Sequence, residues 1–579
     1  MRAGAVSGRR RGGTAAGLFG ASLLVAATVL GAGGAFALPS APPSGSASPG
    51  GPGTGGTRGD QDESNGRRGG DRENRGDKGD RGDRGDHGEE SGRPGSPGSG
   101  SARPTTTPPS TAASAPTSPS PSASASASAS SSASASASAS GSASAKPSAV
   151  ARPAPAGAVL AAAEAGPGAG LPTAQGLQQA LATVLTDQNL GTVGLAVADA
   201  ADGQLLYGKG ENAAATPAST TKLATSVAAL SLIPGDTRLA TRVVKNAATG
   251  GITLVGGGDP TLTALPADQV QVAGVPADPD TAPASLDALA RQTAAALKAA
   301  GTTTVALDYD VTLYTGPLLH KNHDAENIAA VTPLMVDEGK VDPKSLADAP
   351  ARVTDPAGAA AESFANLLKA QGVTVQGKAK AATAPAAADA PVLGRVDSPT
   401  MARLVERMLT TSDNTLAEAI ARQAAIAAHQ PAAFEGAATA VTQELTRLGV
   451  PMTGVVLNDG SGLHPGNAIP PAVLVKLLAL AASAQHPTLR PVLTGLPIAG
   501  FTGTLGKRFG AGSGAADAAG LVRAKTGSLS GVNTLAGTVV DADGRQLAFA
   551  LMTRTGAPVD TARAAMDRVV ARLAACGCR

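Results

Sequence analysis

The chain has 579 residues, which is enough for more than one domain, and its formal net charge at pH 7 is +2. This near-neutral balance excludes a polycation that binds nucleic acid through its overall charge, so no nucleic-acid partner is expected. Aromatic residues make up 2% of the sequence and tryptophan is absent, so a core must be built from alanine, leucine and valine. The cysteines, Cys576 and Cys578, are too few for a disulfide scaffold or a four-ligand zinc pattern.

Residues 1–38 are predicted to be a targeting segment. Arginines at its start precede an uncharged apolar run, and Ala35-Phe36-Ala37 matches the small-x-small pattern of a cleavage site. Cleavage after Ala37 is the favoured interpretation, but the run is also long enough for an uncleaved signal anchor. Both alternatives predict an exported protein, secreted or membrane-anchored, on the cell-wall side of the cytoplasmic membrane. Contact with the membrane is expected only through this segment, if it stays uncleaved.

Residues 39–155 are predicted to be a disordered linker. They are rich in serine, glycine, proline and charged residues and show no apolar periodicity. Such compositions cannot bury enough apolar surface to offset the entropy of the chain. A charged run from Gly76 to His87 repeats Arg-Gly-Asp, and we interpret it as a solvated segment rather than as a cell-adhesion site.

The folded part begins with residues 156–237. A helix is expected over 171–190 and a strand over 193–199, with a second strand after the Asp202-Gly203 turn. A further helix is expected from Pro217 onward, since apolar residues recur there at helical spacing.

Ser219 and Lys222 lie three residues apart at the start of that helix. Residues at this spacing share a helix face, so the hydroxyl and the amine can meet. An amine that is kept neutral can act as the base for a serine nucleophile. By itself, however, Ser-x-x-Lys also fits a helix cap followed by a surface lysine.

Residues 238–396 are predicted to be an inserted, β-rich domain with short helical pieces. The expected elements are strands at 241–244, 252–255 and 303–307 and helices at 285–300 and 358–371. Within this region, His320 and His323 could form a metal site with Asp324 or Glu326, but a polar loop is the favoured interpretation.

Residues 397–579 are predicted to begin with helices and to end in a sheet. The expected elements are helices at 401–409, 415–428, 471–484 and 558–575 and strands at 522–528, 533–540 and 546–553. Because strands at both ends of the folded chain surround a helical centre, one sheet assembled from both ends is expected.

Three short motifs follow one another along the chain: Ser-x-x-Lys at 219–222, Ser-Asp-Asn at 412–414 and Lys-Thr-Gly at 525–527. Each motif is weak alone. Their order, and their expected places on a helix start, a loop and a strand, form the signature set of penicillin-recognising serine enzymes.

The chain resembles the D-alanyl-D-alanine carboxypeptidase/endopeptidase family, the class C low-molecular-mass penicillin-binding proteins. That family carries a large insertion between its first two motifs, as this chain does between Lys222 and Ser412. The resemblance covers about 170–579 and includes these further stretches: 254–262, 459–463, 503–505 and 525–529. The inserted region looks shorter than is usual in the family.

The resemblance implies an α/β (α+β) fold with a penicillin-binding/β-lactamase-like transpeptidase domain, in which helices flank an antiparallel sheet. Residues 156–237 and 397–579 would form this catalytic domain around the inserted domain, 238–396.

The resemblance also implies acyl transfer on peptidoglycan stem peptides that end in D-Ala-D-Ala. Ser219 would attack the penultimate carbonyl carbon, Lys222 would take the serine proton, and Ser412 would relay a proton to the leaving D-alanine. β-Lactams would acylate Ser219 and leave slowly. Neither a metal nor an organic cofactor is implied.

Substrate binding is assigned to four further residues by the same resemblance. Asn414 would hydrogen-bond the peptide amide of the substrate, and Lys525 with Thr526 would bind its carboxylate. The backbone amides of Ser219 and Ser528 would form the oxyanion hole.

Two alternatives remain at this point. A serine β-lactamase uses the same three motifs, although it normally lacks the long insertion. A non-catalytic cell-wall-binding protein could combine the linker with an inactive enzyme domain, although all three motifs are intact.

Overall fold

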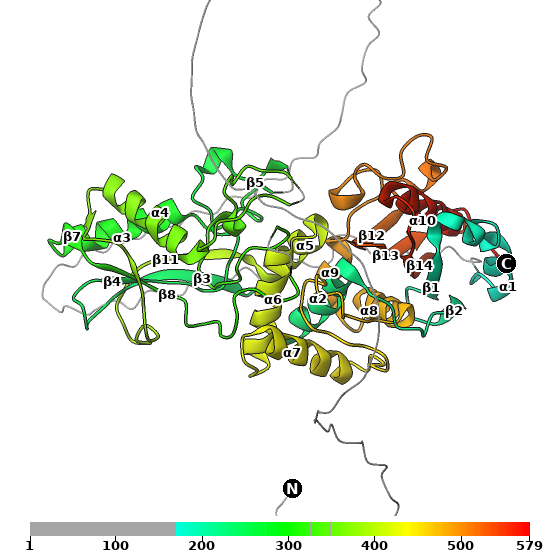
Figure 1. Ribbon diagram of the computed structural model, residues 1–579, viewed down its shortest axis with the longest axis horizontal. Helices are drawn as coiled ribbons and strands as arrows, with labels where there is room; N and C mark the ends of the chain where they lie inside the picture. Colours follow the sequence, from blue (N-terminus) through cyan, green and yellow to red (C-terminus); the bar gives the residue numbers. More distant parts are fainter. Residues whose placement is uncertain (1–169, 273, 324–325, 348) are drawn as a thin grey trace, which may run out of the picture. The chain divides into compact units, whose positions relative to one another are not determined.

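The computed structural model describes residues 170–272, 274–323, 326–347 and 349–579 (Figure 1). The targeting segment and the linker predicted from the sequence lie outside the described residues, so both stay predictions.

The first sheet is antiparallel and has the strand order β12-β13-β14-β1-β2. Its strands are β1 (Thr192–Asp199), β2 (Leu205–Lys209), β12 (Val522–Leu529), β13 (Val532–Val540) and β14 (Gln546–Arg554). β1 pairs with β14 along its whole length, from Thr192 opposite Arg554 to Asp199 opposite Leu547. The prediction of one sheet assembled from both ends of the folded chain is therefore confirmed.

The two faces of this sheet carry different side chains because successive residues of a strand point to opposite faces. Ala196 and Ala550 lie on the face covered by α8 (Pro471–Ala482). The bulkier Leu195 and Phe549 point to the other face, which packs on α1 (Ala174–Leu181) and α10 (Val559–Ala574). Figure 1 shows β14 between α8 and α10. The predicted α+β arrangement, with an antiparallel sheet flanked by helices, is confirmed.

Helix α2 (Thr221–Leu232) lies at the centre of the helical layer and is buried from Thr221 to Leu230. Its neighbours are α5 (Met401–Thr411), α6 (Asn414–Ala427), α7 (Phe434–Arg447) and α8. The apolar spacing in the sequence indicated one inward face. The structure instead buries the helix all round, and Thr225 and Ser226 remain satisfied because their hydroxyls donate to the carbonyls of Gly460 and Lys222.

The second sheet, between the first two motifs, is mixed and has the strand order β10-β8-β4-β3-β11. Its strands are β3 (Arg238–Lys245), β4 (Ile252–Val255), β8 (Leu307–Asp310), β10 (Lys380–Ala381) and β11 (Val392–Thr400). Helices α3 (Leu286–Ala299) and α4 (Pro356–Ala370) share a hydrophobic core with it. Two short strand pairs accompany it: β5 (Gln271–Val272) with β6 (Val275–Pro276), and β7 (Thr304–Val305) with β9 (Thr374–Val375).

Several local predictions need correction. The helix expected over 171–190 spans only Ala174–Leu181, and two separate single turns follow it, Val184–Thr186 and Gln188–Leu190, the second of which is capped by the Asp187 side chain. The strand expected at 303–307 divides in two, since Thr304–Val305 pairs with β9 while Leu307 begins β8 and pairs with β4. Helix α7 was not predicted. The boundaries of the domains stay predictions.

No single described helix is long and apolar enough to cross a membrane. Helix α8 and the following segment Pro487–Thr494 meet that criterion only as a pair, which is bent by 112°.

Candidate active site

Ser219 lies in a single turn, Ala218–Thr220, that leads directly into α2. Ala218 adopts a φ of 47°, a left-handed conformation that is costly for a residue with a side chain. The turn is held in place because the hydroxyls of Thr220 and Thr534 both donate to the Pro217 carbonyl, at 2.6 and 2.8 Å. Strand β13 thereby fixes the serine at the edge of the helical layer.

Gly527, in the third motif, lets β12 approach this turn. A Cβ atom at this position would lie 2.9 Å from the Ser219 amide nitrogen and 2.8 Å from the Pro217 carbonyl oxygen. Both distances are too short for a side-chain carbon, so the backbone of β12 can lie against the serine turn only with glycine here. This contact brings the Ser219 amide beside the strand that carries Ser528, as an oxyanion hole built from both would require.

Gly527→Ala is expected to lower the rate constant for acylation by penicillin about 10²–10³-fold, because the added methyl group displaces the Ser219 amide, and loss of one oxyanion donor has an effect of that size. Stopped-flow measurement with a fluorescent penicillin checks this. Gly556→Ala is the matched control, since a Cβ atom there meets no atom within 4 Å. Equal acylation rates for the two variants would contradict the assignment of this amide.

Lys222 is fully buried, and its Nζ atom contacts three oxygens. Nζ lies 2.9 Å from Ser219 Oγ, 2.7 Å from Asn414 Oδ1 and 2.7 Å from the Ser461 carbonyl oxygen. The amide and carbonyl oxygens can only accept hydrogen bonds, whereas a hydroxyl can also donate. A neutral amine has two N–H groups, and when these donate to the two acceptors its lone pair is left facing the Ser219 hydroxyl. This arrangement suits proton transfer from serine to lysine.

Burial lowers the pKa of Lys222 to about 8, against the opposing effect of the carboxylates of Asp413, Asp459 and Glu418. A sizeable fraction of the amine is therefore neutral near physiological pH, as a base must be. Desolvation of the buried amine is the largest cause of this lowering of the pKa, and it outweighs the three carboxylates.

The acylation rate is expected to fall about tenfold for each pH unit below the pKa of Lys222, because protonation removes the lone pair that takes the serine proton. Acylation rate constants measured with a fluorescent penicillin at a series of pH values check this. A profile that stays flat from about pH 6 to pH 8 would exclude Lys222 as the titrating base.

Lys525 forms the second lysine centre. Its Nζ atom donates to Ser412 Oγ at 2.8 Å and to the Thr526 carbonyl at 2.7 Å. Burial, followed by the charge of Lys222, places the pKa of Lys525 well below its usual range. Both contacts are to uncharged oxygens, so an arriving carboxylate would stabilise the ammonium form. Ser412 reaches this centre because it ends α5 with a φ of 62°.

The remaining predicted site residues lie near these two centres. Thr526 Oγ1 is 2.8 Å from Thr504 Oγ1. The Ser528 side chain is exposed and accepts from Arg563 Nη2 at 3.1 Å. Asn414 was expected to contact substrate, but its Oδ1 holds Lys222 and its Nδ2 donates to the Asn327 carbonyl at 2.9 Å. In the structure Asn414 therefore orients the base, and its role toward substrate stays a prediction.

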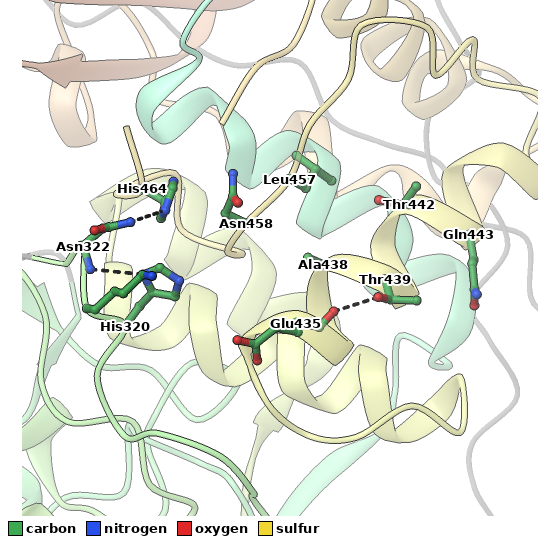
Figure 2. Close-up of a pocket in the computed structure, with 11 residues that line it drawn as sticks. His320, Asn322, Glu435, Ala438, Thr439, Thr442, Gln443, Leu457, Asn458 and His464 are labelled. Carbon is green, nitrogen blue, oxygen red and sulfur yellow. Dashed lines mark hydrogen bonds between the residues drawn. The ribbon is translucent and has the colours of Figure 1, made fainter. Parts of the chain in front are cut away.

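A pocket of about 720 Å³ lies beside this site, and Figure 2 shows its lining. Asn458 and His464, which line it, flank the loop that carries Ser461. Asn322 links two histidines there, because its side chain contacts His464 Nε2 at 2.6 Å and its amide donates to His320 Nδ1 at 3.2 Å. None of the seven predicted site residues lines this pocket.

The metal site considered for His320 and His323 with Asp324 or Glu326 is not the arrangement of acidic groups that the structure places around His323. Asp324 lies outside the described residues, and His323 Nε2 instead contacts Asp459 Oδ2 at 2.8 Å. His323, Asp459 and Glu418 offer ligand atoms within 4.8 Å of one another, so their spacing could hold a metal ion. Because backbone and side-chain N–H groups already donate to both oxygens of Asp459, we assign no metal to this cluster.

Sequence reasoning missed Ser461, Thr504 and Glu418 as members of the site. In the sequence, the stretches around Ser461 and Thr504 stand out only as matches to the resembling family. Glu418 lies one turn beyond the second motif on α6, and nothing in its local pattern distinguishes it from a surface glutamate.

Comparisons with known proteins identify the family of this chain. The model of the D-Ala-D-Ala carboxypeptidase 3 (S13) family matches residues 177–351 and 346–573. A carboxypeptidase of Mycobacterium tuberculosis is 34% identical over 420 residues, which cover 71% of this chain and 86% of that protein. A D-alanyl-D-alanine carboxypeptidase of an Actinomadura species is 30% identical over 462 residues, which cover 69% of this chain and 84% of that protein.

Among solved structures, penicillin-binding protein 4 of Haemophilus influenzae is similar in fold, with a TM-score of 0.53 and 20% identity. The match covers 67% of this chain and 98% of that one. The same protein is also known in complex with a β-lactam. The family resemblance read from the sequence is confirmed: the chain belongs to the D-Ala-D-Ala carboxypeptidase 3 (S13) family.

Proposed function

We propose that this protein is a serine-type D-Ala-D-Ala carboxypeptidase and endopeptidase that acts on peptidoglycan stem peptides through an acyl-enzyme on Ser219. The observation that carries the proposal is the position of Lys222, whose buried amine lies 2.9 Å from Ser219 Oγ with its other contacts to obligate acceptors. Membership of the family supports the same activity.

In the first half-reaction, Ser219 Oγ forms a bond to the carbonyl carbon of the penultimate D-alanine while its proton passes to Lys222. Collapse of the tetrahedral intermediate breaks the C–N bond, and the proton that Lys222 took passes by way of Ser412 to the leaving nitrogen, so Lys222 is neutral again. The Nζ atom of Lys525 lies 2.8 Å from Ser412 Oγ, so a protonated Lys525 would keep the electrostatic field around Ser412 positive. Water then attacks the ester and regenerates Ser219.

Recognition of the substrate carboxylate is assigned to Lys525 and Thr526. A carboxylate here would supply the anion that the buried ammonium group lacks, and the paired hydroxyls of Thr526 and Thr504 offer hydrogen-bond donors beside it. β-Lactams carry a carboxylate and a reactive amide, so they should enter the same way and acylate Ser219. The β-lactam complex of the Haemophilus protein supports this.

An exported location fits a peptidoglycan substrate. We infer it from the apolar segment within residues 1–38, and residues 39–155 would then link that segment to the enzyme.

Digestion of purified muropeptides tests the proposal. Carboxypeptidase action converts pentapeptides to tetrapeptides and releases D-alanine, whereas endopeptidase action converts cross-linked dimers to monomers. Rapid turnover of penicillin in place of a stable adduct would favour a serine β-lactamase. Binding to muropeptides without any product would favour a non-catalytic wall-binding protein.

A further inference from the structure

The Ser461 carbonyl is one of the two acceptors that orient the Lys222 amine, and it belongs to the loop 459–463. The loop packs directly on the serine turn, because Gly462, with a φ of 86°, leaves no room for a side chain against the Ala218 carbonyl. The position of this loop therefore decides where one N–H group of Lys222 points.

The Glu418 side chain holds the loop in place through hydrogen bonds to its backbone. It is fully buried on α6, and its Oε1 atom accepts hydrogen bonds from the amides of Gly460 at 3.0 Å and Ser461 at 2.8 Å. Its other oxygen lies 3.5 Å from Arg422 Nη1. The amide of Ser461 thus donates to the Glu418 carboxylate, while the carbonyl of the same residue accepts a hydrogen bond from Lys222 Nζ.

Asp459 closes the loop on itself. Its Oδ1 accepts from the Gly462 amide at 2.9 Å and from Asn467 Nδ2 at 2.6 Å. Its Oδ2 accepts from the His464 amide at 2.7 Å and contacts His323 Nε2 at 2.8 Å. Both ends of the loop are therefore tied to one buried carboxylate.

We propose that Glu418 and Asp459 are positioning residues for Lys222, which fix the Ser461 carbonyl so that the amine lone pair faces the Ser219 hydroxyl. The inference rests on the proposed function of Ser219 and Lys222. A neutral amine with two fixed acceptors has one orientation for its lone pair. If the Ser461 carbonyl moves away, an N–H group can face Ser219 and the lone pair is lost to the reaction.

The same carboxylates also act on Lys222 through their charge. The charged groups around the amine are Asp413, Glu418 and Asp459, which favour its protonated form, and Lys525 on β12. Burial raises the pKa of Asp459, but the side-chain hydrogen bonds with His323 and Asn467 outweigh it and place the pKa below its usual value, which favours the ionised form. Loss of the Asp459 charge should therefore lower the pKa of Lys222.

The first test compares penicillin acylation rates of purified full-length variants. Glu418→Ala is expected to slow acylation about 10- to 100-fold, because the loop loses two charge-assisted hydrogen bonds. Glu418→Gln keeps an acceptor oxygen and should recover most of the rate. Glu444→Ala is the matched control, since Glu444 is also a buried helical glutamate but contacts Ser231 and Arg447 instead. A wild-type rate for Glu418→Ala, an equal loss for Glu444→Ala or no recovery with Gln would overturn the proposal.

The second test is decisive even if Glu418→Ala fails to fold. In Asp459→Asn, the plateau of the acylation–pH profile should fall because the Ser461 carbonyl is no longer held, and the acid limb should move to lower pH because Lys222 loses a neighbouring negative charge. Partial unfolding alone would lower the plateau and leave the limb in place. An unmoved limb overturns the proposal.

A crystal structure of Glu418→Gln and of Asp459→Asn separates this inference from the proposed function. If the unmodified protein is not labelled by penicillin, the proposed function fails. The distance from Lys222 Nζ to the Ser461 carbonyl can still be measured in the crystal structures of both variants. The inference requires the Ser461 carbonyl to leave Lys222 Nζ in Asp459→Asn and to stay in Glu418→Gln. A retained contact in Asp459→Asn contradicts it.

Discussion

Ser219→Ala is expected to abolish covalent labelling by penicillin and to reduce D-alanine release to background. The variant keeps the turn, because the hydrogen bonds that hold it come from Thr220 and Thr534 rather than from the serine hydroxyl. It loses the oxygen that forms the acyl bond, so no adduct can accumulate. Gel fluorescence and intact-protein mass spectrometry after incubation with a fluorescent penicillin measure the result.

Ser530→Ala serves as the control for this experiment, since Ser530 is an exposed serine close to the third motif. It should label at the wild-type rate. Persistent labelling of Ser219→Ala, with the adduct mapped to another residue, would remove Ser219 from the role of nucleophile.

Lys222→Met is expected to lower the acylation rate constant about 10²–10⁴-fold, the range for loss of a general base. Methionine fills much of the buried space without a charge and cannot take the serine proton. Asn414 Oδ1 and the Ser461 carbonyl lose their donor in the same variant. The rate constant from stopped-flow acylation is the appropriate measurement, because it reports the step in which the base acts.

Lys298→Met provides a comparison, since this exposed lysine lies on α3 of the inserted region. Thermal denaturation of both variants shows whether the fold is retained. An acylation rate in Lys222→Met within a few-fold of wild type would exclude Lys222 as the base.

Local patterns in the sequence predicted the parts of the site that depend on short spacing. The contact between Ser219 and Lys222 spans three residues of one helix start, so helix geometry alone brings the two side chains together. Lys525 lies on the strand that was expected over 522–528, which the structure gives as β12. One sheet assembled from both ends of the folded chain was also expected, and the structure forms it by pairing β1 with β14.

Long-range contacts limited what the sequence could reveal. Lys222 and Ser461 are 239 residues apart, and the bond from Ser461 to Glu418 spans 43 residues. No periodicity connects such positions, because tertiary packing alone makes them neighbours. His323 illustrates the same limit: the sequence suggested nearby acids as its partners, whereas the structure pairs it with Asp459, 136 residues away.

The release of D-alanine from a synthetic peptide that ends in D-Ala-D-Ala tests the central claim most directly. The account predicts stoichiometric D-alanine and a shortened peptide with the wild-type protein, inhibition by penicillin, and no release by Ser219→Ala. Hydrolysis that continues unchanged in Ser219→Ala, or a folded wild-type protein that releases no D-alanine, would contradict it.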